Sequence, residues 1–176
     1  MSGAGRLRPP VLIRAAGAAD HDAIWSILEP VYRAGETYCI DRDITRDDAL
    51  ADWFAAPFTA FVAERDGVIL GTSHVGRNRP GGASHVANAS FATAPAARGQ
   101  GVAGALVIHA KDWARGQGFR AMQFSFVVAS NEDAVHSWKK AGFDVVGQLP
   151  GAFLHPRLGY VDALVMFTDL TKDTAP

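Results

Sequence analysis

The apolar residues near the beginning of the chain follow first a strand-like and then a helix-like pattern. Residues 11–15 form a short apolar run ahead of a glycine, which predicts an opening strand. Asp20 stands where a helix N-cap belongs, and apolar residues then recur at helical spacing until Pro30 and Gly35 disturb them. This spacing predicts a first helix of about three turns.

The next segment combines a helix start with a hairpin signal. Thr45-Arg46-Asp47-Asp48 has the pattern of a capping box, so a second helix is expected to begin there and to end before Pro57. Two β-prone runs follow at residues 58–64 and 68–75, with Asp66-Gly67 between them. Because Asp-Gly favours a tight turn, these two runs are expected to pair as antiparallel strands.

A third strand of this group is expected at residues 84–93, where side chains alternate between two faces. One face carries Val86, Asn88 and Ser90, and the other carries His85, Ala87, Ala89 and Phe91. Apolar residues then recur at helical spacing from residue 100 to the glycines at 116 and 118. This pattern predicts a long amphipathic helix.

The last part of the chain predicts one more helix between strands. Residues 120–129 are β-prone, and Ser130-Asn131-Glu132-Asp133 has the pattern of a second capping box, for a helix that stops at Gly142. Residues 143–149 and 160–170 supply two closing strands. The expected order is β-α-α-β-β-β-α-β-α-β-β, an α/β fold with helices on both faces of a mixed, mostly antiparallel sheet.

Composition and charge narrow the class of protein. With 176 residues, 48% of them hydrophobic, the chain fits one domain at residues 11–170, between a flexible arm at 1–10 and a tail at 171–176. A formal net charge of -1 gives no basic field for a phosphate backbone, so nucleic acid is not an expected partner.

No apolar run is long enough to span a membrane, and residues 1–10 lack the apolar centre of a secretory signal. Cys39 is the only cysteine, which excludes an internal disulfide and a zinc-binding cysteine cluster and fits a reducing compartment such as the cytoplasm.

The glycine-rich loop Arg98-Gly99-Gln100-Gly101-Val102-Ala103-Gly104 carries the clearest chemical signal. It follows a predicted strand and opens a predicted helix, where unpaired N–H groups and the positive end of the helix dipole favour an anion. The glycines permit positive φ and a close approach to a phosphate, so a pyrophosphate is the expected ligand. The sequence lacks the Gly-Lys-Ser/Thr ending of a P-loop. Gly99-Gln100-Gly101 matches the first half of a dinucleotide fingerprint, so nicotinamide dinucleotide binding stays an alternative, as does a plain glycine-rich turn.

With these motifs the chain resembles the GNAT superfamily of N-acetyltransferases. Its motif A, Gln/Arg-x-x-Gly-x-Gly/Ala, is matched by Arg98, Gly101 and Ala103. Its motif B is matched by Asn131, Ala134 and Gly142-Phe143. The resemblance spans about residues 11–170 and implies the GNAT fold, a cytoplasmic enzyme, acetyl-CoA as co-substrate and no metal.

The resemblance also implies how the cofactor is held. The loop from Arg98 to Gly104 is expected to bind the pyrophosphate of CoA, and the strand at Ala92 and Thr93 is expected to pair with the pantetheine arm. The strand that begins near Arg120 is expected to splay from its neighbour, and Asn131 to reach the same arm.

Trp138 stands where many GNAT enzymes have a tyrosine that acts as general acid toward the leaving thiolate. An indole cannot donate a proton in that role, so Trp138 is expected to pack beside the cofactor. The thiolate, with a pKa of about 8–9, can then leave without an acid.

A finer resemblance points to the azetidine-2-carboxylate (proline-analogue) N-acetyltransferases. It rests on residues 85–91 and 126–131 and on Trp138, and it implies a small amino acid, imino acid or analogue as acceptor. Asn88 and Asn131 match asparagines of the acceptor and thioester site in that branch, and Ser125 replaces a third. From the residues alone, Asn88 fits a bulge or strand edge equally well.

The loop between the first two helices holds the candidate bases Glu36 and Tyr38, since an amine must be deprotonated before it attacks a thioester. An exposed acid and a packing tyrosine are the alternative interpretations of these two residues. Other functions also stay open: acetylation of a protein N-terminus or a lysine, a non-catalytic CoA-binding module, and a homodimer that pairs an exposed closing strand.

Overall fold

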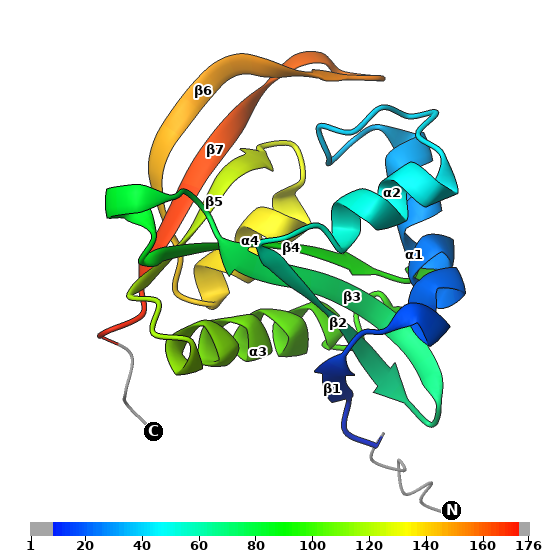
Figure 1. The fold of residues 1–176 in the computed structure, drawn as a ribbon. Helices are drawn as coiled ribbons and strands as arrows, with labels where there is room; N and C mark the ends of the chain where they lie inside the picture. The colour runs from blue at the N-terminus through cyan, green and yellow to red at the C-terminus, as the bar shows by residue number, and fades with distance from the viewer. Residues whose placement is uncertain (1–8, 173–176) are drawn as a thin grey trace, which may run out of the picture.

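A computed structural model describes residues 9–172 of the protein. One mixed sheet of seven strands runs through it in the order β1-β2-β3-β4-β5-β7-β6, as Figure 1 shows. The strands are β1 Leu12–Ala15, β2 Phe58–Arg65, β3 Val68–Arg77, β4 Val86–Thr93, β5 Ala121–Val128, β6 Asp144–His155 and β7 Gly159–Asp169. The helices are α1 His21–Ala34, α2 Arg46–Trp53, α3 Val102–Gly116 and α4 Glu132–Lys140. The predicted α/β fold and its order of elements are confirmed, while residues 1–8 of the predicted arm and 173–176 of the predicted tail lie outside the described residues.

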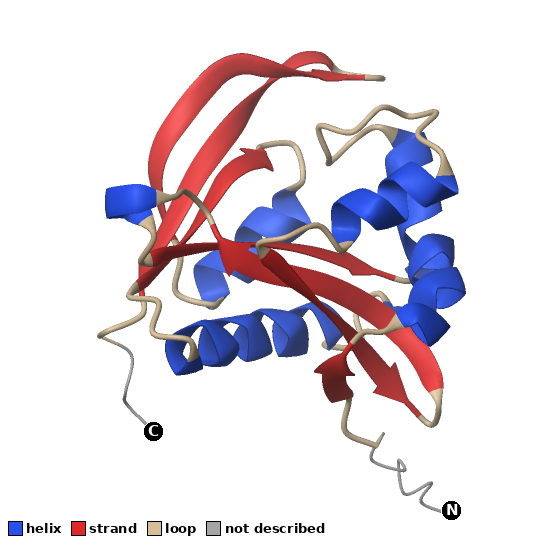
Figure 2. Ribbon diagram, viewed as in Figure 1, coloured by secondary structure: helices blue, strands red, loops and turns tan. Residues whose placement is uncertain are grey.

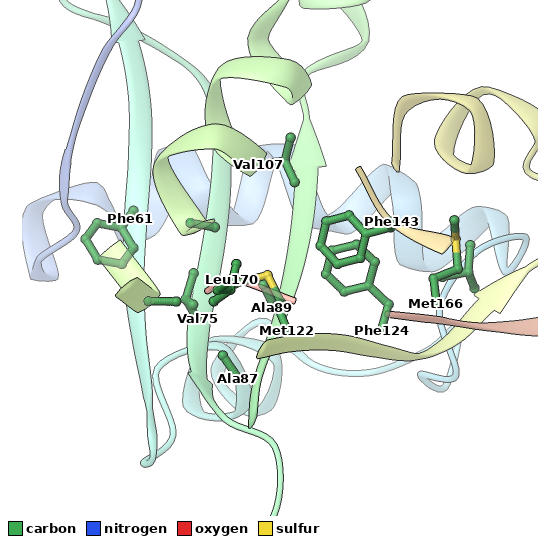
Figure 3. Close-up of a cluster of buried hydrophobic side chains, with 13 residues drawn as sticks. Phe61, Val75, Ala87, Ala89, Val107, Met122, Phe124, Phe143, Met166 and Leu170 are labelled. Atoms are coloured by element: carbon green, nitrogen blue, oxygen red, sulfur yellow. The ribbon is translucent and has the colours of Figure 1, made fainter. Parts of the chain in front are cut away.

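Two hydrophobic clusters place the helices on opposite faces of the sheet (Figure 2). On one face, Val107 of α3 and Phe143 pack against strand residues such as Ala87, Phe124 and Met166, which Figure 3 labels. On the other face, residues of α1 and α2 pack against Ala60, Val62 and Ala92. The alternation expected along β4 is confirmed, because Ala87 and Ala89 face α3 while Ala92 faces α1.

Several predicted element boundaries have the expected local cause. The Thr45 hydroxyl accepts a hydrogen bond from the backbone N–H of Asp48 at 3.1 Å, so the helix start expected at Thr45 is confirmed. The Asp48 carboxylate accepts from the Thr45 hydroxyl, so the reciprocal bond of a capping box is not formed. Asp66 and Gly67 have φ of 52° and 77°, the left-handed pair of a tight hairpin turn between β2 and β3. α3 begins at Val102, close to the expected position.

Other boundaries differ from the prediction. α1 does not end at Pro30, and the helix is 14 residues long. Tyr32, which lies beyond the proline, is buried in the core together with the other residues on the inner face of α1. The Asp20 side chain does not cap α1, since it pairs with Arg14 and accepts from the N–H of Gly17. The cap of α4 is Asn131, whose side-chain oxygen faces the N–H of Ala134 at 3.4 Å, and not Ser130.

The largest difference lies in the last hairpin. The sixth strand was expected at residues 143–149, but β6 extends to His155 and β7 begins at Gly159. Pro150 does not end the strand, because register shifts lie between Leu149 and Phe153, where the pairing with β7 is irregular. The result is a long hairpin that reaches past the rest of the sheet (Figure 1).

The only parallel pair in the described sheet, β4 with β5, separates soon after it begins. The two strands pair only at Val86 with Ala121 and at Ala87 with Met122. Beyond this point β4 follows β3 as far as Thr93, while β5 follows β7. The predicted splay is therefore present, and it leaves the β4 edge from Asn88 onward without a strand partner. No helix within residues 9–172 is long and apolar enough to cross a membrane.

Candidate functional site

The N-terminus of α3 presents a row of backbone N–H groups without acceptors. Gly99 and Gly101 have φ of 70° and 79°, which turns the chain sharply into the helix. Along α3, the first backbone N–H that donates to the preceding turn is that of Ala105. Its acceptor is the carbonyl of Gly101, at 3.0 Å. Within the described chain no backbone acceptor is found for the N–H groups of Gly99, Gly101, Val102, Ala103 and Gly104. Of the three glycines, Gly99 and Gly101 use the positive φ that glycine permits, whereas Gly104 lies in the first turn of α3.

The space in front of these groups is open, and the loop behind them is held firmly. A Cβ atom built at Gly99, Gly101 or Gly104 meets nothing within 4 Å. The Gln100 side chain accepts from Arg65 at 2.9 Å and donates to the carbonyl of Ala96 at 2.7 Å. A fixed loop with outward N–H groups at the positive end of a helix has the chemistry of an anion site, and it fits a pyrophosphate.

The opened edge of β4 runs from Asn88 to the end of the strand, ahead of the glycine-rich loop that forms the anion site. The Asn88 side-chain oxygen accepts from the backbone N–H of Ala89 at 2.8 Å, just where β5 leaves β4. Asn88 therefore lies at a strand edge, one of the positions that the sequence left open for it. Within residues 9–172 no acceptor is found for its side-chain N–H groups, which can donate to a ligand. Ala92 and Thr93 lie at the far end of the same edge.

Tyr38 reaches this edge from the loop between α1 and α2. Its hydroxyl donates to the carbonyl of Phe91 at 2.5 Å, and its ring contacts Tyr32 edge-on at 5.5 Å between centroids. Burial raises the pKa of Tyr38 above its ordinary value. A tyrosine that stays protonated can donate but cannot accept a proton, so the geometry does not favour Tyr38 as the base.

The other predicted base, Glu36, forms an ion pair with Arg157 at 2.7 Å. Arg157 lies in the turn between β6 and β7, far from Glu36 in the sequence. The turn is held by His155, whose buried Nδ1 accepts from the N–H groups of Arg157 and Leu158 at 3.2 Å each. The pair therefore joins the α1–α2 loop to the tip of the last hairpin.

Ser125 lies in a small polar cluster on β5 that sequence reasoning found only in part. Its hydroxyl donates to the side-chain oxygen of Asn78 at 3.4 Å and accepts from the Gln123 amide at 3.3 Å. Strand alternation could have shown that Gln123 and Ser125 share a face. Asn78 could not be found in this way, because it follows β3 and reaches Ser125 only through the fold.

Trp138 lies on α4, at the other side of the splay, and Asn131 is the N-cap residue of the same helix. Trp138 packs against Phe91 of β4 and Phe124 of β5, with ring centroids at 5.0 and 5.4 Å. The packing role expected for this tryptophan is consistent with these contacts. Within residues 9–172 no hydrogen bond joins Asn88, Ser125 and Asn131 to one another, although all three lie on elements that border the splay.

His74 is a structural residue that had no assigned partner in the sequence. It is buried between the rings of Trp53 and Phe58, at 4.3 and 4.5 Å, and its Nδ1 is 3.0 Å from the Trp53 carbonyl. Burial lowers its pKa, so the ring is neutral at pH 7. Trp53, in turn, donates to the Thr72 hydroxyl and belongs to the core.

The open N–H groups at a helix N-terminus, together with the free edge of two separating strands, suit an extended ligand that carries a phosphate and groups able to hydrogen-bond to a strand edge. The family model of the Acetyltransferase (GNAT) family matches residues 21–143, and the chain belongs to this family. It is an acetyl-CoA-dependent N-acetyltransferase with acetyl-CoA as its co-substrate, as the sequence predicted.

Solved structures agree with this assignment. A GCN5-related N-acetyltransferase from Kribbella flavida is 42% identical, with a TM-score of 0.87 over 90% of this chain and 97% of that chain. The protein yncA from Salmonella typhimurium, solved with its cofactor acetyl-CoA, is 26% identical, with a TM-score of 0.80 over 94% and 97%. A ribosomal-protein-alanine N-acetyltransferase from Brucella melitensis is 25% identical, with a TM-score of 0.76 over 90% and 99%.

Proposed function

We propose that the enzyme transfers the acetyl group to the amino group of a small amino acid, imino acid or analogue, as in the azetidine-2-carboxylate branch. The observation that carries this proposal is a hollow of about 290 Å³ between the α1–α2 loop and β6, lined among others by Gly35, Tyr38, Arg42, Phe153 and Leu154. Tyr38 lines this hollow and also contacts the open edge of β4. A space at the lower end of the usual range for ligand pockets suits a small acceptor.

In this proposal the open N–H groups from Gly99 to Gly104, with Arg98 beside them, bind the pyrophosphate of acetyl-CoA. The β4 edge at Ala92 and Thr93 pairs with the pantetheine amides, which satisfies backbone groups that the splay leaves bare. The free side-chain amide of Asn131 donates to the same arm. Trp138 packs along it.

The chemistry requires a neutral amine beside a polarised thioester. Glu36 accepts a proton from the acceptor ammonium, directly or through water, because an alkylammonium of pKa near 10 is almost wholly protonated at pH 7. The amine nitrogen then bonds to the acetyl carbon while the bond from that carbon to sulfur breaks, and the second amine proton is lost to solvent. The Asn88 amide donates to the acetyl oxygen as negative charge develops there. The thiolate leaves without an acid, since Trp138 cannot supply one.

A second candidate acceptor is the N-terminus of a protein. The observation in its favour is the similarity to the ribosomal-protein-alanine N-acetyltransferase, at 25% identity. A peptide needs an open groove on the acceptor side, whereas the Glu36–Arg157 ion pair joins the two walls of that side in this chain. Because this pair is exposed and can open, the size of the hollow, about 290 Å³, is the observation that favours the small acceptor.

We also propose that the enzyme works in the cytoplasm and forms a homodimer. The lone, reduced Cys39 suits a reducing compartment. The dimer is supported by β6, which is the last strand of the sheet and carries exposed apolar side chains.

The acceptor proposal is tested by release of CoA in steady state with three classes of acceptor: small amino and imino acids, simple amines, and a peptide with a free N-terminal alanine. The expected result is turnover of a small amino or imino acid with a kcat/KM at least about tenfold above that of the peptide. A peptide preferred over every small acceptor would overturn it in favour of the second candidate.

A further inference from the structure

The ion pair between Glu36 and Arg157 joins two segments that each rest on one of the splayed strands. Glu36 lies two residues before Tyr38, which donates to the Phe91 carbonyl on β4. Arg157 lies in the turn after Phe153, whose ring contacts Phe126 of β5 at 6.2 Å. Figure 1 shows this turn, at the end of the β6–β7 hairpin, beside the loop that follows α1. The pair is therefore held on the acceptor side of the sheet by contacts from both strands.

We propose that Arg157 and Glu36 together recognise the carboxylate and the ammonium group of a zwitterionic acceptor. This inference rests on the proposed function, and it assigns the two charges of the acceptor to two side chains. The Arg157 guanidinium matches a carboxylate through two parallel N–H bonds, and the Glu36 carboxylate takes the ammonium end. A zwitterion that inserts between them replaces one ion pair by two, with no net change of charge.

The pair is built to open. The Arg157 side chain is 74% exposed and that of Glu36 is 33% exposed, and an ion pair this accessible to water contributes little to stability. The backbone on both sides is fixed, by His155 under the turn and by Tyr38 in the loop. The two side chains can therefore give up their contact with each other and bind a ligand, at a small cost in free energy, while the backbone stays in place.

Arg42 lines the hollow described above, but its side chain already has a partner. Arg42 donates through its Nε to the carbonyl of Arg33 at 2.8 Å, and Arg33 donates back to the carbonyl of Arg42. These two bonds close the α1–α2 loop against the end of α1. Arg42 therefore shapes the hollow, whereas Arg157 is free to exchange its partner.

Matched acceptor pairs separate the two charges. L-proline and pyrrolidine, azetidine-2-carboxylate and azetidine, and L-alanine and ethylamine differ mainly by the carboxylate. For R157Q we expect the KM of the carboxylated member to rise about 10- to 100-fold, with kcat and the plain amine little changed. For E36Q we expect kcat/KM to fall for both members, because both carry the amine. R157K, which keeps the charge but not the fork, should lie between wild type and R157Q.

The control is R120Q, which removes the same charge from an exposed arginine at the closed end of β4 and β5 and should change neither member of a pair. Thermal unfolding midpoints of all variants show that each is folded. If R157Q affects both members of every pair equally, or affects neither, the carboxylate assignment is wrong while the proposed function stands. If the wild type turns over no carboxylated acceptor, the proposed function fails and the inference with it.

Discussion

At the scale of single residues, Tyr38 is a side chain whose role follows from one contact. Its hydroxyl donates to the Phe91 carbonyl in the opened edge of β4, and burial raises its pKa. The sequence offered Tyr38 as a base, but with this hydrogen bond and a raised pKa we expect the hydroxyl to position the loop over the splay and not to remove a proton. Glu36 remains the proposed base.

Replacement of Tyr38 by phenylalanine tests this distinction. The substitution Tyr38→Phe removes the donor to a partly buried carbonyl, so we expect the free energy of unfolding to fall by about 1–2 kcal/mol and kcat/KM to fall no more than about tenfold. The pH profile of kcat should keep its shape. Tyr160→Phe, at a side chain that is 78% exposed, should change neither quantity. A loss of activity above a thousandfold, with an altered pH profile, would restore Tyr38 as the base.

Asp20 shows a second residue whose predicted role changed once its partners were known. Its pairing with the Arg14 guanidinium holds the pKa of this carboxyl at about 2, well below its ordinary 3.8. The contribution to stability is therefore complete above about pH 4 and is lost as the pH falls through about 2. For Asp20→Asn we expect a loss of about 1–2 kcal/mol in the free energy of unfolding at pH 7.

Urea unfolding of wild type and Asp20→Asn between pH 7 and pH 2 measures this directly. The difference between the two proteins should stay constant from pH 7 to about pH 5 and shrink toward pH 2. Asp22→Asn is the control, since Asp22 pairs with Arg46 at the surface and is 93% exposed. A difference that grows on acidification contradicts the assignment.

At the scale of elements, the geometry of the first turn of α3 depends mainly on residues that are neighbours in the chain. These are the glycines of the loop that leads into the helix. Gly101 has φ of 79° and lies directly before the row of open N–H groups. The substitution Gly101→Ala places a Cβ in a backbone conformation that costs about 1 kcal/mol and changes the aim of these groups. We expect the Kd of acetyl-CoA, measured by calorimetry, to rise at least about tenfold.

The matched control is Gly116→Ala at the other end of the same helix, where φ is not positive and a Cβ meets nothing within 4 Å. It should bind acetyl-CoA as the wild type does. Equal affinities for both variants would contradict the placement of the pyrophosphate at this loop.

The same scale shows what the sequence could predict and what it could not. The Thr45 cap, the Asp66-Gly67 turn and the start of α3 depend on neighbours in the chain, and local patterns predicted them. α1 continues past Pro30 and β6 past Pro150, because burial of Tyr32 and pairing with β7 outweigh the local signals of proline. The sequence did not indicate Asn78 or Arg157 for a related reason: Asn78 meets Ser125 at a separation of 47 residues. Arg157, in the turn between β6 and β7, meets Glu36 in the loop after α1.

At the scale of the whole molecule, the free edge of β6 predicts how two copies meet. Val145, Val146, Leu149 and Leu154 on this strand are 40%, 60%, 40% and 63% exposed. An exposed edge strand with apolar side chains favours pairing with another strand. We expect a dimer in sedimentation equilibrium at micromolar concentration and a monomer for Val146→Lys. Val68→Lys, at a side chain that is 58% exposed on the β2–β3 hairpin, should leave the dimer intact. If the wild type is a monomer, or if Val68→Lys and not Val146→Lys disrupts the dimer, the two copies do not pair through β6.

At the scale of the whole molecule we propose that acetyl-CoA binds at the splay between β4 and β5 and that a small acceptor binds in the hollow between the α1–α2 loop and the last hairpin. A crystal structure with CoA and an unreactive amino acid analogue tests both assignments in one measurement. We expect phosphate oxygens on the N–H groups from Gly99 to Gly104, and an acceptor amine between Asn88 and Glu36 with its carboxylate on Arg157. Acceptor density on another side of the sheet, or CoA away from the N-terminus of α3, would contradict this proposal.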